Sequence, residues 1–239
     1  MSMENGAGRT NISQRYFNPL LISMYDFLVY RVVSQYIWGC SNALLIQRYQ
    51  HYVSPHHLEV GVGTGYLVDK SDANISRLDL MDLSRACLRK SSKRLHRYYP
   101  SIIRHNVLEK PLEDDKRYDS IGINYVMHCV AGDFTDKGIV FANLKKLLTN
   151  RGVIFGATVL QTDQSSSRAK LFMWFLNRIG IFNNANDNYD DLKHALEKHF
   201  RHVRIFISDR SSVALFAVSD EQQHLHDVEA VPNKIHNEV

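Results

Sequence analysis

A turn with three closely spaced glycines follows a short apolar segment near residue 58. Glu59 precedes glycines at positions 61, 63 and 65. Glycine lets the backbone pass a ligand at a distance where a Cβ atom would collide. The turn also exposes backbone N–H groups at the start of the following helix, which is a favourable position for a carboxylate or phosphate. The residues therefore predict a turn that binds a ligand, with Glu59, Gly61, Gly63 and Gly65 in contact with that ligand.

A second acidic residue, Asp82, lies 21 positions after Gly61, where the next predicted strand ends. A carboxylate has two oxygens and can accept hydrogen bonds from both hydroxyls of a ribose. In open α/β sheets an acid at this spacing takes that role. In the alternative interpretation, Asp82 caps the following helix, and Asp79 inside the strand is the fallback acid.

Asn124, Tyr125 and His128 form a third group, at the exit of a predicted strand that begins near residue 118. Ligands in open α/β sheets bind beyond the carboxyl ends of the strands, so these side chains are expected at the site. Histidine titrates near neutral pH, and His128 is the best-placed candidate for a general base. The alternative is a histidine that enters a helix and bonds to the backbone.

The glycine spacing decides which kind of ligand is expected. Dinucleotide-binding turns need Gly-x-Gly-x-x-Gly, and here Tyr66 occupies the position of the third glycine. The spacing present, (Asp/Glu)-x-Gly-x-Gly-x-Gly, resembles the first motif of the class I S-adenosylmethionine-dependent methyltransferases. Residues 118–128, which begin with Tyr-Asp and end with Met-His, are similar to another segment of that family.

The resemblance implies S-adenosylmethionine as the cofactor and S-adenosylhomocysteine as the product. The turn would hold the methionyl end, Asp82 the ribose, and Asn124 would face the methyl group. The family usually has Asp where this chain has Asn106, to accept the adenine amino group; Asn can accept through its carbonyl oxygen. Leu83 and Val107, which follow Asp82 and Asn106, are expected to complete the cofactor contacts.

Aromatic residues outside these motifs indicate a largely apolar substrate. Two helices are predicted over residues 19–38 and 41–53, the second with Ser41 as its N-cap. Methyltransferases of this class commonly build a substrate lid from such an extension. Tyr25 and Trp38 are therefore expected to contact the substrate; alternatively, these helices only cover a sheet edge. Tyr125, at the exit of the strand that begins near residue 118, is also expected to contact the substrate. Helix 168–180 is apolar over most of its circumference, which favours core packing or a pocket wall, and Trp174 is its candidate substrate contact.

The implied function is methyl transfer to a small metabolite, in the manner of secondary metabolism. A different interpretation is a methyltransferase fold repurposed for cyclisation, rearrangement or ligand binding. Nucleic-acid methylation is disfavoured, because Asn124 is followed by Tyr-Val-Met and not by the Pro-Pro-aromatic sequence of many base amino-methyltransferases.

Composition agrees with a globular enzyme. The chain has 239 residues with 44% hydrophobic content, enough for one sizeable core. Its net charge of +4 is too small to indicate nucleic-acid binding. Cysteines at positions 40, 87 and 129 are too widely spaced for a disulfide framework or a metal site. With no bilayer-spanning run and no signal pattern, a cytoplasmic protein without metal, membrane or nucleic-acid partners is expected, and its oligomeric state stays open.

Alternating strand and helix patterns from residue 56 to 218 predict an α/β fold. The resemblance to the class I methyltransferases implies that this fold is a doubly wound, mostly parallel seven-stranded sheet closed by a carboxyl-terminal antiparallel hairpin, with an N-terminal helical cap. The predicted organisation is a disordered N-terminus (1–13), the helical cap (14–54), the methyltransferase core (55–218) and a polar, disordered tail (219–239). The fifth strand is expected over 153–160, after a helix over 137–148 that stops at Gly152.

Overall fold

The computed structural model describes residues 27–111, 116–222 and 225. The predicted N-terminus 1–13, the start of the predicted cap with Tyr25, and most of the predicted tail lie outside these residues. Ser219, predicted as the first tail residue, is the last residue of a strand.

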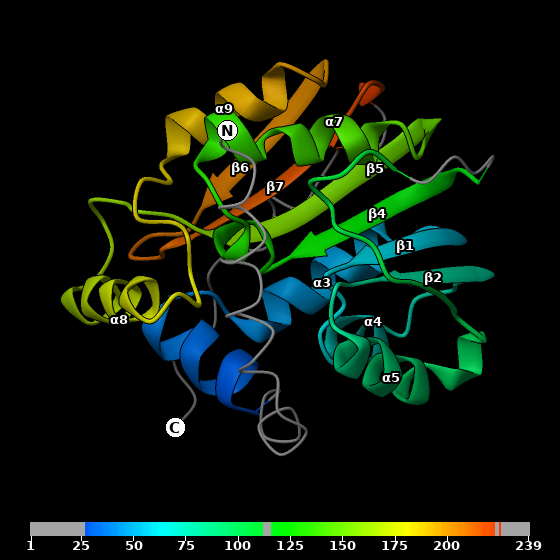
Figure 1. Ribbon diagram of the computed structural model, residues 1–239, viewed down its shortest axis with the longest axis horizontal. Coiled ribbons are helices and arrows are strands. Elements are labelled where there is room, and N and C mark those ends of the chain that lie inside the picture. Colours follow the sequence, from blue (N-terminus) through cyan, green and yellow to red (C-terminus); the bar gives the residue numbers. More distant parts are fainter. Residues whose placement is uncertain (1–26, 112–115, 223–224, 226–239) are drawn as a thin grey trace, which may run out of the picture.

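One sheet of seven strands forms the centre of the fold (Figure 1). In spatial order the strands are β3 (Ser101–Ile103), β2 (Arg77–Met81), β1 (His56–Val60), β4 (Tyr118–Asn124), β5 (Leu148–Val159), β7 (Val213–Ser219) and β6 (His202–Ile207). The first five strands in this spatial order, from β3 across to β5, pair in parallel. Strand β7 runs antiparallel to both of its neighbours, β5 and β6. The predicted sheet with its carboxyl-terminal hairpin is confirmed.

The strand order reverses between β1 and β4. From β1 the chain moves outward through β2 to β3, and it then returns to the other side of β1 as β4. Such a reversal leaves a crevice at the carboxyl ends of the two central strands, where α/β sheets bind ligands. The glycine turn follows β1 and Asn124 ends β4, so both border this point.

Helices cover both faces of the sheet. On one side lie α3 (Asn42–Tyr52), α4 (Tyr66–Ser71), α5 (Arg85–Arg94) and α8 (Ser167–Arg178), and on the other α6 (Phe134–Lys137), α7 (Ile139–Lys145) and α9 (Tyr189–Glu197). Each side has its own core, with Leu45 and Phe155 in the first and Phe141 and Leu192 in the second. Short 3₁₀ turns lie at His96–Tyr98 and Met127–Cys129.

The described part of the cap consists of η1 (Phe27–Ile37), which has π-helical hydrogen bonding, and α3. The predicted N-cap of α3 is confirmed, because Ser41 Oγ accepts a hydrogen bond from Leu44 N at 3.2 Å. Helix α3 packs against the sheet next to α4, while η1 contacts α8.

The predicted boundary between the α7 helix and the fifth strand is wrong. Helix α7 ends at Lys145, and Gly152 lies inside β5. A Cβ atom on Gly152 would lie 3.0 Å from the Tyr118 carbonyl oxygen, and the β4–β5 register shifts next to Tyr118. The glycine therefore permits close strand approach at an irregular pairing, instead of ending a helix.

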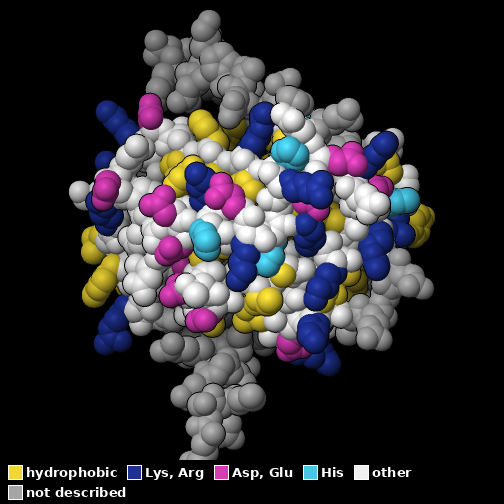
Figure 2. All heavy atoms as spheres, turned by 90° about the horizontal axis from the view of Figure 1, so that it is seen from above, with side chains coloured by type: hydrophobic (Ala, Val, Ile, Leu, Met, Phe, Trp, Pro, Cys, Tyr) yellow, Lys and Arg dark blue, Asp and Glu magenta, His cyan; other side chains and the backbone are white. Residues whose placement is uncertain are grey.

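Charged side chains of both signs cover the face seen from above Figure 1, where Lys and Arg are interspersed with Asp and Glu (Figure 2). Among the described helices, none is long and apolar enough to cross a membrane. Within the same ranges, no three His, Cys, Asp or Glu side chains are grouped as a metal ion would require.

Candidate active site

The three glycines of the turn after β1 have left-handed backbone conformations but different surroundings. Their φ angles are +65°, +52° and +72° at Gly61, Gly63 and Gly65. A Cβ atom on Gly61 would meet Val126 Cγ2 at 2.2 Å, and one on Gly65 would meet Leu95 Cδ1 at 2.9 Å. A Cβ atom on Gly63 would have no heavy atom within 4 Å. Gly63 therefore presents backbone to open space, as the methionyl end of the expected cofactor requires, while its two neighbours allow close packing.

Asp82 lies directly beside this turn. Its Oδ2 accepts a hydrogen bond from Gly63 N at 3.4 Å, and its Oδ1 accepts one from Ser84 N at 2.8 Å. Helix α5 is capped by Ser84, whose Oγ accepts from Cys87 N, so the capping alternative for Asp82 does not hold. Burial raises the pKa of the Asp82 carboxyl. Carboxylate oxygens have further lone pairs, so Asp82 fits an acceptor for the cofactor's ribose.

The loop after β3 carries the predicted adenine contacts. Asn106 Oδ1 accepts from Leu108 N at 3.1 Å, so the side chain stabilises its own turn. Asn143 of α7 donates to the carbonyls of Val107 at 3.2 Å and Glu109 at 2.9 Å. Sequence reasoning missed Asn143. The available signal was a polar residue on the apolar face of a predicted helix.

The carboxyl end of β4 connects to the cap. Asn124 donates through Nδ2 to Tyr49 Oη of α3 at 2.9 Å. Tyr125 adopts φ +57°, which is uncommon for a residue with a side chain, and its hydroxyl lies 2.7 Å from Ser34 Oγ of η1. The two described cap helices, η1 and α3, therefore contact Tyr125 and Asn124 at the carboxyl end of β4.

Glu59 is bound within the protein on both carboxylate oxygens. Tyr49 donates to Oε1 at 2.5 Å, and His57 Nε2 lies 3.0 Å from Oε2. Glu59 is 5% exposed. A contact between Glu59 and the cofactor stays a prediction, and it would have to use the remaining lone pairs.

His128 is buried, with 3% exposure, and its ring centroid lies 4.2 Å from that of Phe182. Nδ1 accepts a hydrogen bond from Val159 N at 3.2 Å, so in the neutral ring the proton is on Nε2. Burial, with a smaller effect of the Lys137 charge, lowers the pKa of His128 to about 3. The general-base role stays a prediction, and these contacts weigh against it because the acceptor nitrogen is already bonded.

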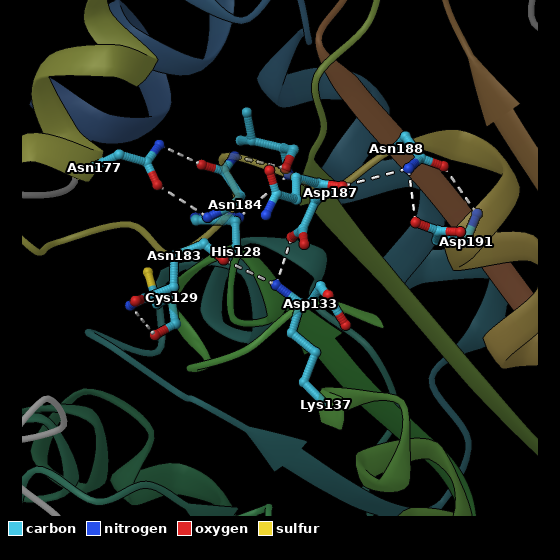
Figure 3. A network of polar contacts seen from close by, with 12 residues as sticks. His128, Cys129, Asp133, Lys137, Asn177, Asn183, Asn184, Asp187, Asn188 and Asp191 are labelled. Carbon is cyan, nitrogen blue, oxygen red and sulfur yellow. Dashed lines mark hydrogen bonds and ion pairs between the residues drawn. The ribbon is translucent and has the colours of Figure 1, made fainter. Parts of the chain in front are cut away.

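A buried ion pair fastens the loop that follows α8 (Figure 3). Lys137 Nζ lies 2.5 Å from Asp187 Oδ2 and donates to the Asn183 carbonyl at 3.2 Å. Asn183 N in turn donates to the His128 carbonyl at 2.7 Å. Lys137 was predicted only as the start of a helix over 137–148, and no partner was predicted for its side chain, so this pair was missed.

Asn184 extends the same connection to β5 (Figure 3). Its Nδ2 donates to the Val159 carbonyl at 2.9 Å, and its Oδ1 accepts from Asn177 of α8 at 2.7 Å. The loop between α8 and α9 is thereby fixed at the carboxyl end of the sheet, next to the predicted site.

The predicted substrate residues separate into two groups. Trp38 is 3% exposed and stacks on Phe182, which in turn contacts His128, and the ring of Tyr125 lies 5.8 Å from that of His128. Trp174 does not join this aromatic cluster and is 63% exposed on α8. The expected core packing of α8 is wrong for Trp174 and its two apolar neighbours, Leu171 and Phe175, which are also exposed.

Comparison with known proteins identifies the family. Residues 58–154 match the methyltransferase domain family. The chain is 35% identical to demethylluteothin O-methyltransferase of Streptomyces thioluteus, over 85% of this chain and 89% of that protein. It is 34% identical to the N-methyltransferase vrtF of Penicillium aethiopicum, over 76% of this chain and 77% of that protein.

A solved structure of the DhpI complex with S-adenosylhomocysteine has the same fold, with a TM-score of 0.65 and 12% identity over 92% of this chain and all of that one. The family resemblance seen in the sequence is confirmed by these matches. The chain belongs to the class I S-adenosylmethionine-dependent methyltransferases.

Proposed function

We propose that this enzyme transfers the methyl group to a hydroxyl oxygen of a small, largely apolar metabolite of secondary metabolism. The similarity to demethylluteothin O-methyltransferase, which spans most of both chains, carries the proposal. Both relatives described above are named as methyltransferases, which gives no support to the non-methylating alternative.

The aromatic cluster beyond β4 supports an apolar acceptor. Trp38, Tyr125 and Phe182 lie around His128 near the crevice between β1 and β4. Aromatic and aliphatic walls with a few polar groups are typical of sites for small organic ligands. Trp174 stays a proposed substrate contact without support from this cluster. Tyr25 also stays proposed, and it lies outside the described residues.

The cofactor is proposed to lie along the carboxyl ends of β1, β2 and β4. Gly61, Gly63 and Gly65 would hold its methionyl end, with Glu59 and Asn124 nearby. Asp82 would accept the ribose hydroxyls, and three residues of neighbouring loops would line the adenine: Leu83, Asn106 and Val107. When bound, S-adenosylmethionine supplies a methyl group on an electrophilic sulfonium.

His128 is proposed to orient the acceptor oxygen by donating from Nε2, since Nδ1 is committed to Val159. The protein's contribution would then be mainly alignment, which in well-aligned systems is worth about 7–11 kcal/mol. We further infer that the enzyme works in the cytoplasm without nucleic-acid or membrane partners, an inference supported by its three free cysteines and the mixed surface charge of Figure 2.

The test is an acceptor screen with purified protein and S-adenosylmethionine. The panel contains apolar phenols and enols, the amines of matching shape, and the O-methyl ethers of the same phenols as blocked controls. We expect S-adenosylhomocysteine to form together with a methylated product for the hydroxyl compounds and for none of the ethers. Transfer to the amines alone would overturn the oxygen assignment, and no turnover with any compound would contradict the proposed substrate class.

A further inference from the structure

A continuous series of hydrogen bonds crosses the sheet beneath α3. Ser120 Oγ lies 2.8 Å from His57 Nδ1, and His57 Nε2 lies 3.0 Å from Glu59 Oε2. Tyr49 donates to the other oxygen of Glu59 at 2.5 Å and accepts from Asn124 Nδ2 at 2.9 Å. All five side chains are buried, the most exposed being Asn124 at 7%. The series ends at the crevice where the cofactor is expected.

The donors in this series point toward Glu59 from both ends. A carboxylate only accepts hydrogen bonds, so His57 and Tyr49 must each donate one to Glu59. The Tyr49 hydroxyl has one proton, and it is committed to Glu59. Its oxygen can therefore meet Asn124 only as an acceptor. This requirement assigns the amide of Asn124: the nitrogen faces Tyr49, and the carbonyl oxygen lies on the opposite side of the amide group.

Asn124 is placed where such an oxygen is useful. It is the last residue of β4, and its neighbour Ile123 pairs with Val60, directly before Gly61. The Cβ position of Gly61 is blocked by Val126, so the glycine turn and the β4 exit are in contact. The methionyl part of the cofactor carries an ammonium group, which is a donor and needs acceptors. Buried polar acceptors bind such a group strongly when they are already oriented.

We propose that Tyr49 is a positioning residue that holds the Asn124 carbonyl oxygen toward the ammonium group of the cofactor. Tyr49 acts through Asn124 and is anchored by Glu59 and His57. The inference rests on the proposed contact between Asn124 and the methionyl end. It also gives α3 of the cap a role in cofactor binding, which the sequence did not indicate.

Tyr49→Phe tests this idea, because the ring and its packing on Phe155 at 5.1 Å are retained while the hydroxyl is removed. Two probes are compared by calorimetry. S-adenosylhomocysteine carries the amino-acid end, and 5′-methylthioadenosine lacks it. We expect the affinity for S-adenosylhomocysteine to fall about tenfold, as for loss of one oriented hydrogen bond to a charged group, with the affinity for 5′-methylthioadenosine unchanged.

Tyr52→Phe is the matched control. Tyr52 lies on the same helix, is buried, and stacks on the same Phe155 at 5.3 Å. Its substitution should leave the affinities for both probes unchanged, whatever its effect on thermal unfolding. An equal loss of both probes in Tyr49→Phe would show a merely structural role and overturn the proposal.

Asn124→Ala provides a second test should Tyr49→Phe fold poorly. The ratio of the two affinities should shift in the same direction. Where Tyr49→Phe does fold, adding it to Asn124→Ala should cause little further loss, because the two residues act as a unit. An unchanged ratio in Asn124→Ala overturns the proposal while leaving the methyltransferase assignment intact. Absence of binding by the wild-type protein would instead contradict the cofactor site itself.

Discussion

The imidazole of His128 is held neutral by its surroundings. It is packed against Phe182, its Nδ1 accepts from Val159 N, and the Lys137 charge is close. Burial lowers the pKa of His128 from an ordinary value of 6.5 to about 3. The unfolded chain binds a proton to this ring below its ordinary pKa, whereas the native protein does not.

This difference predicts how stability depends on pH. The stability that depends on a neutral His128 is present in full above about pH 6.5 and is lost as the pH falls toward 3. Between these pH values, the free energy of unfolding should fall by about 1 kcal/mol for each unit by which the pH is lowered. His128→Asn keeps an acceptor for Val159 N but does not titrate. Urea unfolding of this variant at about pH 7.5 and about pH 5 should therefore show a smaller loss of stability than wild type.

His194 of α9 serves as a control, since it is exposed whereas His128 is buried. His194→Asn should keep the wild-type pH dependence of the free energy of unfolding. Equal pH dependence in wild type and His128→Asn would mean that the native ring takes up a proton, and the neutral His128 described above would be wrong.

Among single residues, the sequence predicted those whose spacing along the chain is recognisable. Asp82 was placed beside the glycine turn from its distance along the chain, and the structure has it within hydrogen-bond distance of Gly63. Asn143 and Lys137 were not predicted, because their roles depend on which backbone or carboxylate lies opposite them after folding. Pairwise partners of that kind leave no periodic pattern in one sequence.

Among the structural elements, the glycine turn has two separate roles: Gly65 allows helix packing, and Gly63 exposes backbone to open space. Gly65 allows α5 to approach, since a Cβ atom there would meet Leu95 and Ser91 at 2.9 and 3.2 Å. Gly63 has open space around its Cβ position. Both residues have positive φ, so replacement by alanine costs each about 1–2 kcal/mol of backbone strain.

Alanine at the two positions should therefore give different defects. Gly65→Ala has a steric cost of about 1–3 kcal/mol in addition to the backbone strain. It should therefore lower the free energy of unfolding more than Gly63→Ala does. Gly63→Ala should be less destabilised but should bind S-adenosylhomocysteine more weakly, because the new methyl group would occupy the position proposed for the cofactor. Urea unfolding and calorimetry on both variants measure this. Wild-type affinity in a folded Gly63→Ala protein would be incompatible with the proposed binding turn.

Elements were predicted well where one signal was strong and poorly where two competed. The N-cap of α3 followed from Ser41 alone. Gly152 could end a helix or mark an irregular strand, and only the close approach of Tyr118 decides between them. In α8 the apolar residues surround the helix, so periodicity could not identify which of them, such as Ala169 and Met173, would be buried.

At the scale of the whole molecule, the site is a consequence of strand order. The reversal between β1 and β4 brings together a glycine turn and Asn124, which are 59 or more positions apart in the chain. Alternation of strands and helices predicted an α/β fold, but the doubly wound seven-stranded sheet with its hairpin came from the family resemblance. Contacts between the cap and the sheet, such as Tyr49 with Glu59, could not be predicted because they join separate elements.

The glycine turn and Asp82 are proposed to bind one cofactor molecule together. Calorimetry with S-adenosylhomocysteine tests this proposal most directly, on wild type, Asp82→Asn and Asp79→Asn. Asp79 is a matched control, because it is fully buried inside β2 and accepts from Tyr118 Oη at 2.6 Å. We predict one site per chain in wild type, affinity reduced about tenfold or more in Asp82→Asn, and wild-type affinity in Asp79→Asn. Undiminished affinity in Asp82→Asn, or no heat with the wild-type protein, would contradict the account.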